Sequence, residues 1–410
     1  MKTIKAQSFL SNTICLSKLM STLVILFYLV SCNESKQNDD NSLLTFDITN
    51  LNKTEEVKAS EVGIIDIEYI PLETTAESAI AYIRDVQKDE SSYYIKTDNE
   101  NIASEKFTRF DLKGNFIAQL GRRGGGPQEY KGINDFSIGA DGNIYILSIN
   151  DKKIYVYTNT GDFVRVIDTP TPTTFYIECI DDGIICYSMD YRTSLPHILH
   201  ILNYDGNVIK KLPNRFQSSE PSFGAYPCKG ALYKNEGKIY LKEPFTDTVF
   251  CLNESDMTME PAFAMDRGGL TPTKEEYGRI RNKRPKTLID VRLLNFGDNI
   301  YLEFVDENNN DIPFGYFSSF DKSRQYLMNI KEVGLIDDID GGPTIWMQSV
   351  LNNTTVIAWI DAISLIEHVS SAAFRNSNPK YPEKKKELEE LVKGMDLYSN
   401  PVLMLLKFEE

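Results

Sequence analysis

The densest group of residues that could do chemistry is a glycine-rich segment, GRRGGGPQEY, at residues 121–130. Its glycines and arginines suggest a cradle for a phosphate group. Such a cradle needs a Gly-Lys-Ser/Thr ending or a following helix whose N-terminus faces the anion, and the sequence has neither. The glycines and Pro127 suit a chain that crosses between two sheets, so we predict a structural turn. The candidates within it for an exposed ligand-binding surface are Arg122, Arg123, Glu129 and Tyr130.

Histidines offer little acid–base chemistry, because the chain has only three. His197 and His200 flank one expected strand, and His368 lies far away in the sequence. No Gly-x-Ser-x-Gly elbow accompanies them to supply a serine nucleophile. No Cys-x-x-Cys motif or Cys/His cluster indicates zinc. The sequence therefore predicts no catalytic residue, no metal ligand and no cofactor.

The elements that would position these residues repeat about every fifty residues. Each repeat has an apolar strand, a second strand and a tight turn into a third. The turn glycines Gly114, Gly161 and Gly206 lie 47 and 45 residues apart, and Asp, Asn and Gly suit the backbone of a hairpin loop. A period of roughly 40 to 50 residues built from short strands is typical of a β-propeller.

Six such units follow one another, so the predicted fold class is all-β, a six-bladed β-propeller. The units span residues 83–121, 133–168, 174–212, 229–266, 288–330 and 334–408. The last unit ends in a strand at 402–408 and lacks a fourth strand, whereas the strand at 64–72 precedes the first unit and belongs to none. We predict that this N-terminal strand completes the last blade and closes the ring, which removes exposed sheet edges.

Two short helical insertions interrupt the strand pattern. The first, at 271–286, has Thr273 and Glu276 at capping-box spacing and carries a basic cluster in an acidic protein. This cluster is either a solvated face or a contact for an anionic partner. The second, at 382–393, begins with a proline and carries an apolar side that should pack on the propeller.

The N-terminal segment 1–31 indicates an export signal, with a positively charged start and a short apolar run at 23–30. The run is too short for a good membrane span. It ends at Leu29-Val30-Ser31-Cys32, which resembles the lipobox of bacterial lipoproteins, where the signal is removed before a cysteine that is then acylated. Cys32 is thus the predicted lipid attachment site. The alternative is a chance cysteine after an ordinary signal peptide.

Residues 32–41 are polar and should form a flexible tether to the propeller at 42–410. Removing residues 1–31 takes away three of the 44 basic residues and none of the 59 acidic ones, which leaves a net charge of −18. So acidic a body should repel nucleic acid and anionic lipid. We therefore expect attachment through the acyl chains alone, with the body on the periplasmic or the cell-surface side of the outer membrane.

Four cysteines remain beyond the signal and the anchor. If Asp182 and Gly183 form a two-residue turn, Cys179 faces Cys186 across the hairpin. The pair would then be close enough for a disulfide in an oxidising compartment. Two separate buried thiols are the alternative.

The segment 121–130 with Asp135-Phe136, the blade pattern, the lipobox and the final strand after Asn400-Pro401 together resemble a known family. They are similar to the six-bladed β-propeller lipoproteins of Bacteroidota, relatives of the NHL and TolB-like propellers. The resemblance covers most of the mature chain and implies a fold and a location without a reaction. Some propellers of this architecture are calcium-dependent lactonases or related hydrolases. The acidic loop at 306–311 departs from a calcium-binding loop at its glycine position.

These observations favour a lipid-anchored binding or scaffold module of the cell envelope whose ligand is a glycan, a peptide or a protein partner. Propellers present loops at one end and a central channel, where binding residues gather. The alternative is a metal-dependent hydrolase of the lactonase kind with a site in the channel, for which calcium would be the cofactor.

Overall fold

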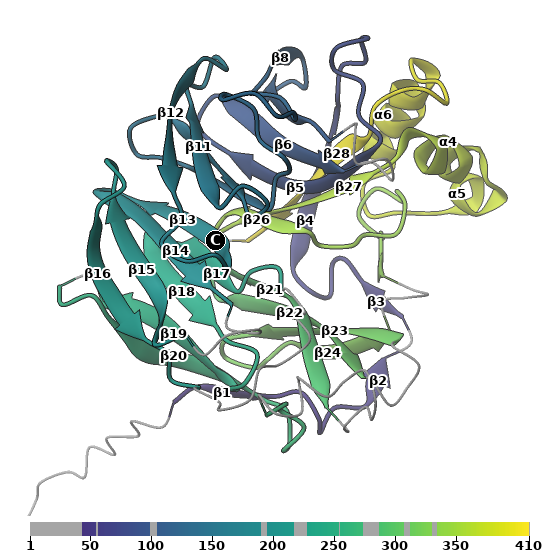
Figure 1. Cartoon of the computed structure of the whole chain (residues 1–410). Helices are drawn as coiled ribbons and strands as arrows, with labels where there is room; N and C mark the ends of the chain where they lie inside the picture. The colour runs from purple at the N-terminus through teal and green to yellow at the C-terminus, as the bar shows by residue number, and fades with distance from the viewer. Residues whose placement is uncertain are drawn as a thin grey trace, which may run out of the picture. The chain divides into compact units, whose positions relative to one another are not determined.

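The computed structural model describes residues 43–54, 56–98, 105–189, 195–216, 228–253, 255–273, 287–306, 312–329 and 334–409. Residues 44–410 form one compact unit. Within it, six sheets of four or five strands are arranged as the blades of a propeller (Figure 1). The predicted fold class is confirmed. The predicted signal peptide, the tether and most of the helix at 271–286 lie outside the described residues.

The first three blades are four-stranded antiparallel sheets that follow one another along the chain. Blade one contains, from the inside outward, β5 (Tyr82–Lys88), β6 (Ser92–Asp98), β7 (Phe107–Asp111) and β8 (Phe116–Gln119). Blade two contains β9 (Asp135–Ile138), β10 (Ile144–Ser148), β11 (Lys153–Tyr157) and β12 (Phe163–Asp168). Blade three contains β13 (Thr174–Ile180), β14 (Gly183–Ser188), β15 (His197–Asn203) and β16 (Val208–Pro213).

Blades four and five each gain a short outer strand from the N-terminal segment, which pairs in parallel. Blade four contains β17 (Leu232–Asn235), β18 (Lys238–Lys242), β19 (Thr248–Asn253), β20 (Thr258–Asp266) and the added β1 (Thr45–Asp47). Blade five contains β21 (Leu288–Phe296), β22 (Asn299–Asp306), β23 (Ile312–Ser319), β24 (Gln325–Asn329) and the added β2 (Lys53–Thr54). A separate pair joins β3 (Val57–Lys58) to β25 (Leu335–Ile336).

The sixth blade combines the two ends of the folded unit. It contains β26 (Ser349–Asn352), β27 (Thr355–Ile360), β28 (Val402–Phe408) and the outermost strand β4 (Ile64–Pro71). β4 runs antiparallel to β28, with Ile67 opposite Leu406 and Ile70 opposite Leu403. The predicted closure by the N-terminal strand is confirmed.

The core consists of six apolar layers, one between each pair of neighbouring blades. The layer between blade six and blade one contains Ile70 of β4, Leu403 of β28 and Val86 of β5. Because this layer is filled like the other five, the ring is closed by packing as well as by strand pairing.

Three helices lie in the described part of the chain, all between β27 and β28. They are α4 (Ala362–Ser370), α5 (Ala372–Asn376) and α6 (Pro382–Lys393). α6 begins and ends where the sequence predicts, and its buried Leu388 packs with Leu365 of α4 and Val402 of β28. α4 and α5 were not predicted. Among the described residues, none of the helices has the length and apolarity needed to span a bilayer.

The repeated turn glycines have the left-handed backbone that the sequence pattern predicts. Gly114, Gly161 and Gly206 have φ angles of 85°, 95° and 89°. In blade one, the Gly114 amide donates to Asp111 O at 3.0 Å, and the Asp111 amide donates to Asn115 O at 2.8 Å. The loop thus has three residues, and a Cβ at Gly114 would lie 2.2 Å from Pro71 O of β4. Glycine is therefore required where blade one meets the closing strand.

The predicted cross-strand disulfide is wrong, because the hairpin turns one residue earlier than expected. Ile180 pairs with Gly183, so Cys179 lies opposite Ile184 and Cys186 lies opposite Ile177. Both thiols are free and buried in the layer between blades two and three. Cys228, which is also buried, is free as well.

Candidate functional site

The glycine-rich segment of the sequence forms the crossing from blade one to blade two. Gly121 has a φ of 62°, a backbone conformation that favours glycine. The Gly124 amide donates to Tyr130 O at 3.0 Å, and the Gly126 amide donates to the Glu129 carboxylate at 2.8 Å. The segment is therefore a turn held by its own hydrogen bonds, which confirms the structural interpretation.

Tyr130 corrects the prediction of an exposed surface in this segment. Its side chain is fully buried in the layer between blades one and two, with its ring edge-on to Tyr155 and Tyr157. Burial raises the pKa of the Tyr130 phenol well above its ordinary value. This residue anchors the crossing and is not accessible to a ligand.

The charged residues of the segment form ion pairs at its surface. Arg122, whose side chain is 75% exposed, lies 2.5 Å from Glu129, and Arg123 lies 4.0 Å from Glu105. The Gly126 amide and then the Arg122 charge lower the pKa of Glu129. None of these residues is among the described ones that line the central channel. Ligand binding by Arg122, Arg123 and Glu129 stays a prediction.

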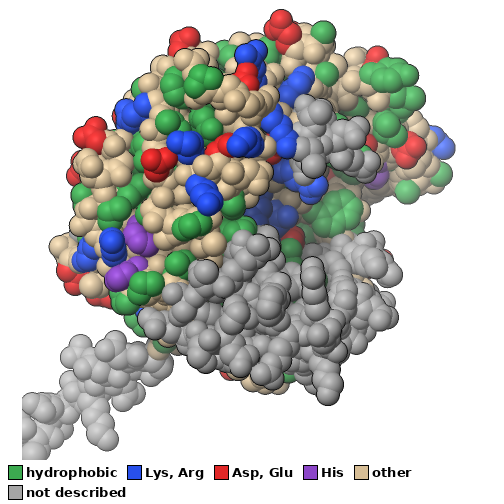
Figure 2. Space-filling view, viewed as in Figure 1, with side chains coloured by type: hydrophobic (Ala, Val, Ile, Leu, Met, Phe, Trp, Pro, Cys, Tyr) green, Lys and Arg blue, Asp and Glu red, His purple; other side chains and the backbone are tan. Residues whose placement is uncertain are grey.

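A cavity of about 1290 Å³ lies where the innermost strands of the six blades face one another. Figure 2 shows several lysine and arginine side chains grouped near the middle of the face that it views. Each blade contributes at least one polar side chain to the wall of this central channel. They include Asp85 of β5, Asp135 of β9, Glu178 of β13, Lys234 of β17, Asn295 of β21 and Ser349 of β26.

Two carboxyl groups of the channel link blades two and three. Asp135 accepts a hydrogen bond from the Ile177 amide at 2.9 Å, and Glu178 accepts one from Ser137 Oγ at 3.1 Å. Burial raises the pKa of Asp135 to about 7, and the charge of Asp85 adds to the rise. Burial and then the neighbouring Asp135 raise the pKa of Glu178 to about 8. Both groups can therefore accept or donate a hydrogen bond near neutral pH.

Asp85 is neutralised by a triangle of contacts that joins three blades across the channel. Lys229, which leads into blade four, lies 2.8 Å from Asp85 and donates to Ser349 Oγ at 2.9 Å. Ser349 in turn donates to Asp85 at 2.8 Å. Burial alone would raise the pKa of Asp85, but the Lys229 charge and these hydrogen bonds outweigh it and lower that pKa. Burial lowers the pKa of Lys229.

The opposite wall of the channel carries amide, phenol and basic groups. Next to this wall, Arg292 of β21 pairs with Glu303 at 3.0 Å and donates to Gln348, which lines the channel. Asn295 Nδ2 donates to the Tyr233 hydroxyl at 3.4 Å, and Asn295 Oδ1 is buried without a hydrogen-bond partner in the described part of the chain. A buried carbonyl oxygen without a partner is costly, so it indicates a position that a ligand or a water completes.

The raised pKa values make a testable statement about stability. Between about pH 4 and pH 8, Asp135 and Glu178 keep their protons in the folded protein but lose them in the unfolded chain. The free energy of unfolding therefore falls as the pH rises through this range. We expect the double variant Asp135→Asn/Glu178→Gln to be about 1–3 kcal/mol more stable than the wild type at pH 8.5. The difference should shrink toward pH 5 in denaturant melts.

The exposed Asp168 provides a control, because its side chain is 85% exposed. The Asp168→Asn variant should show no such pH dependence. An equal stability difference at pH 5 and pH 8.5 in the channel variant would show that Asp135 and Glu178 titrate as ordinary surface acids.

The residues considered for metal or histidine chemistry do not converge on the channel. Among the described residues, no group of three or more His, Cys, Asp and Glu side chains is placed to hold a metal ion. His197 and His200 lie together on β15 of blade three, where burial lowers the pKa of His200 to about 4. His368 lies on α4. Most of the acidic loop at 306–311 lies outside the described residues.

The sequence analysis did not single out the channel residues. Asp85, Asp135 and Glu178 stand roughly one blade apart, each on the innermost strand of its blade and each followed by an apolar residue. A polar residue at the same strand of successive repeats is a signal that could have indicated a shared channel.

The closed ring and its polar channel define a six-bladed β-propeller with a central cavity. The chain belongs to the family described as Domain of unknown function (DUF4934), whose model matches residues 43–407. No curated protein matches the chain.

Two solved structures from Bacteroides are similar to this chain. An exported protein of Bacteroides fragilis is 16% identical over 90% of this chain and 99% of its own, with a TM-score of 0.68. A member of the DUF4221 family from Bacteroides vulgatus is 10% identical over 84% of this chain and 97% of its own, with a TM-score of 0.49. The first likeness confirms the resemblance to exported propellers of these bacteria at the level of the fold.

Proposed function

We propose that the protein is a lipid-anchored binding module of the cell envelope that holds a polar ligand, a glycan or a peptide segment, in its central channel. A rigid ring presents a preformed cavity, and binding to a preformed site avoids the entropy cost of ordering loops. The volume of about 1290 Å³ suits a segment of several sugar or amino-acid residues.

The observation that carries this proposal is the set of channel groups that lack partners. Glu178 uses Oε1 to accept from Ser137, and the described residues offer its other oxygen no hydrogen bond. Asn295 Oδ1, which is buried, also lacks a hydrogen-bond partner in the described part of the chain. Both residues line the channel. Because the fold keeps these groups at a cost in stability, binding is a better explanation for them than packing.

The test is thermal unfolding of residues 42–410 with a panel of oligosaccharides and peptides. A ligand that binds the folded state raises Tm by mass action. We expect such a rise for the wild type, and the part of the rise that a ligand in the channel causes should be lost in the Asp135→Asn/Glu178→Gln variant. Chelator should leave Tm unchanged. A stoichiometric divalent ion together with a chelator-sensitive Tm would instead favour the metal-dependent hydrolase.

Envelope attachment through Cys32 supplies a second prediction. We expect Cys32→Ala to move the protein from the membrane fraction to the soluble fraction, because a body with a net charge of −18 should be repelled by an anionic bilayer. The Tm of the released protein should equal that of the body alone, since the change lies outside the folded unit. Retention of the variant in washed membranes would refute the lipid anchor.

A further inference from the structure

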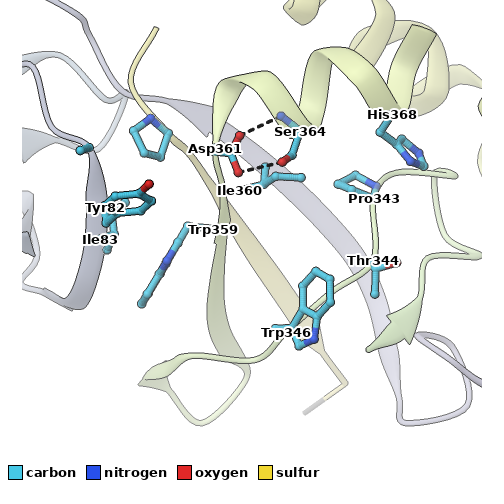
Figure 3. A pocket seen from close by; sticks show the side chains of 12 residues that line it. Tyr82, Ile83, Pro343, Thr344, Trp346, Trp359, Ile360, Asp361, Ser364 and His368 are labelled. Atoms are coloured by element: carbon cyan, nitrogen blue, oxygen red, sulfur yellow. Dashed lines mark hydrogen bonds between the residues drawn. The ribbon is translucent and has the colours of Figure 1, made fainter. Parts of the chain in front are cut away.

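A second cavity, of about 460 Å³, lies where blade six meets blade one and contains both tryptophans of the chain. Trp346 precedes β26, Trp359 lies in β27, and Tyr82 begins β5. Figure 3 shows Tyr82 and Trp359 on one side of this aromatic pocket and Trp346 on the other, with Asp361 between them at the start of α4.

The aromatic rings of this pocket are more exposed than packing requires. Tyr82 is 56% exposed and Trp346 is 39% exposed. Isolated exposed apolar residues are ordinary, but large rings gathered around one hollow mark a binding surface. Tyr and Trp offer flat apolar faces at low cost in side-chain entropy.

The polar groups of the pocket indicate what a ligand must supply. Asp361 caps α4 and accepts two hydrogen bonds from Ser364, each of 2.8 Å, one to each carboxylate oxygen. Each of these oxygens has room for a further bond, and an ionised carboxylate only accepts. The ligand must therefore carry hydrogen-bond donors beside its apolar faces.

Two other ligands of aromatic pockets fit this pocket less well. A proline-rich peptide docks on aromatic grooves but lacks amide donors at its prolines. A cationic group would compete with Lys229, whose Nζ already lies 5.4 Å from the centre of the Trp359 ring. A neutral ligand that has both flat C–H faces and hydroxyl donors meets both conditions, and sugars have this chemistry.

We propose that the aromatic pocket is a carbohydrate-binding site. Pyranose rings stack on Trp346 and on the Tyr82–Trp359 side, and a sugar hydroxyl donates to Asp361. The volume of about 460 Å³ accommodates a short stretch of a glycan and not a folded partner. This site is separate from the central channel, so the proposal of a carbohydrate site does not depend on which ligand the channel binds.

The two tryptophans give the test its readout, because every indole in the protein lines the pocket. Maltohexaose, cellohexaose, xylohexaose and an array of immobilised bacterial and plant glycans are titrated against residues 42–410, with decaproline and choline as the competing probes. We expect a glycan to shift tryptophan emission and to protect it from acrylamide quenching. Trp346→Ala and Tyr82→Ala should each weaken glycan binding about tenfold or more, since truncated aromatic anchors dominate such sites.

Matched variants separate stacking from misfolding. Trp346→Phe keeps a ring and should retain most of the affinity, and Tyr398→Ala removes an aromatic residue that is 88% exposed outside the pocket and should change nothing. If no glycan binds, or if decaproline or choline alone alters the emission, the pocket is not a carbohydrate site. Equal losses in the Trp346→Ala and Tyr398→Ala variants would overturn the assignment too.

Discussion

A chain that lacks residues 42–72 should fail to unfold cooperatively, because the sixth blade loses its outer strand. β4 and the residue after it bury Ile64, Ile67, Ile70 and Leu72 in the two layers that flank blade six. Each such side chain contributes about 1.5–3 kcal/mol when fully buried. The total approaches the whole stability of a typical domain, about 5–15 kcal/mol, even before the loss of β1 to β3. Circular dichroism melts of the truncated and intact bodies measure this.

Two further experiments test whether the loss of cooperative unfolding is due to the closing strand β4. Ile67→Asp in the intact body places an unpaired charge opposite Leu406 and should destabilise it by several kcal/mol. A synthetic peptide of residues 60–73 should restore part of the cooperative melt to the truncated chain by adding the missing strand. If the truncated chain melts like the intact body, β4 does not close the ring.

The second large effect is expected at a buried ion cluster between blades four and five. Lys242 lies 2.7 Å from Asp290, and Arg267 lies 3.3 Å from the same carboxylate, with all three side chains almost fully buried. Removing Asp290 leaves the buried Lys242 charge without its carboxylate partner, whereas Arg267 keeps a second carboxylate, Asp247, at 2.7 Å. We therefore expect Asp290→Ala to destabilise the body by about 3–5 kcal/mol.

An exposed pair serves as the comparison for this cluster. Lys153 and Asp168 lie 3.0 Å apart at the surface, and Asp168→Ala should cost less than about 1 kcal/mol. Urea melts of both variants decide the matter. A loss of under 1 kcal/mol in Asp290→Ala would mean that the two cations are solvated in the folded protein, against the burial seen here.

The sequence predicts those parts of the fold that local chemistry determines. The glycines of the repeated turns need a left-handed backbone, so their spacing alone revealed the blade period. Pro382 begins α6 because its missing amide costs nothing in a first helical turn. The predicted strand at 64–72 belonged to no unit, and the last unit lacked a strand. The sequence therefore indicated that this strand completes the last blade.

Other features depend on register or on very short pairings, which local patterns do not determine. The hairpin between β13 and β14 turns one residue earlier than predicted, so Ile177 and not Cys179 lies opposite Cys186. β1, β2 and β3 have only two or three residues each, too few for a periodic signal. The sequence gives one local signal for the start of α4, the N-cap residue Asp361. The position three residues later, where a capping box has Glu or Gln, is Ser364.

Both candidate sites were beyond sequence reasoning, because each is assembled only when the ring closes. Asp85 and Glu178 are 93 residues apart in the sequence but line the same channel. Tyr82 joins Trp359 from the opposite end of the chain. The conspicuous segment at 121–130 instead proved to be a structural crossing, since its tyrosine is buried and its glutamate binds its own loop.

The central claim, a ligand held in the channel, is tested most directly by a crystal structure. Residues 42–410 would be crystallised with the oligosaccharide or peptide that raises Tm most. We predict ligand density in the channel, within hydrogen-bond distance of Glu178 and Asn295. Density confined to the aromatic pocket or to the segment at 121–130, with only solvent in the channel, would contradict the account.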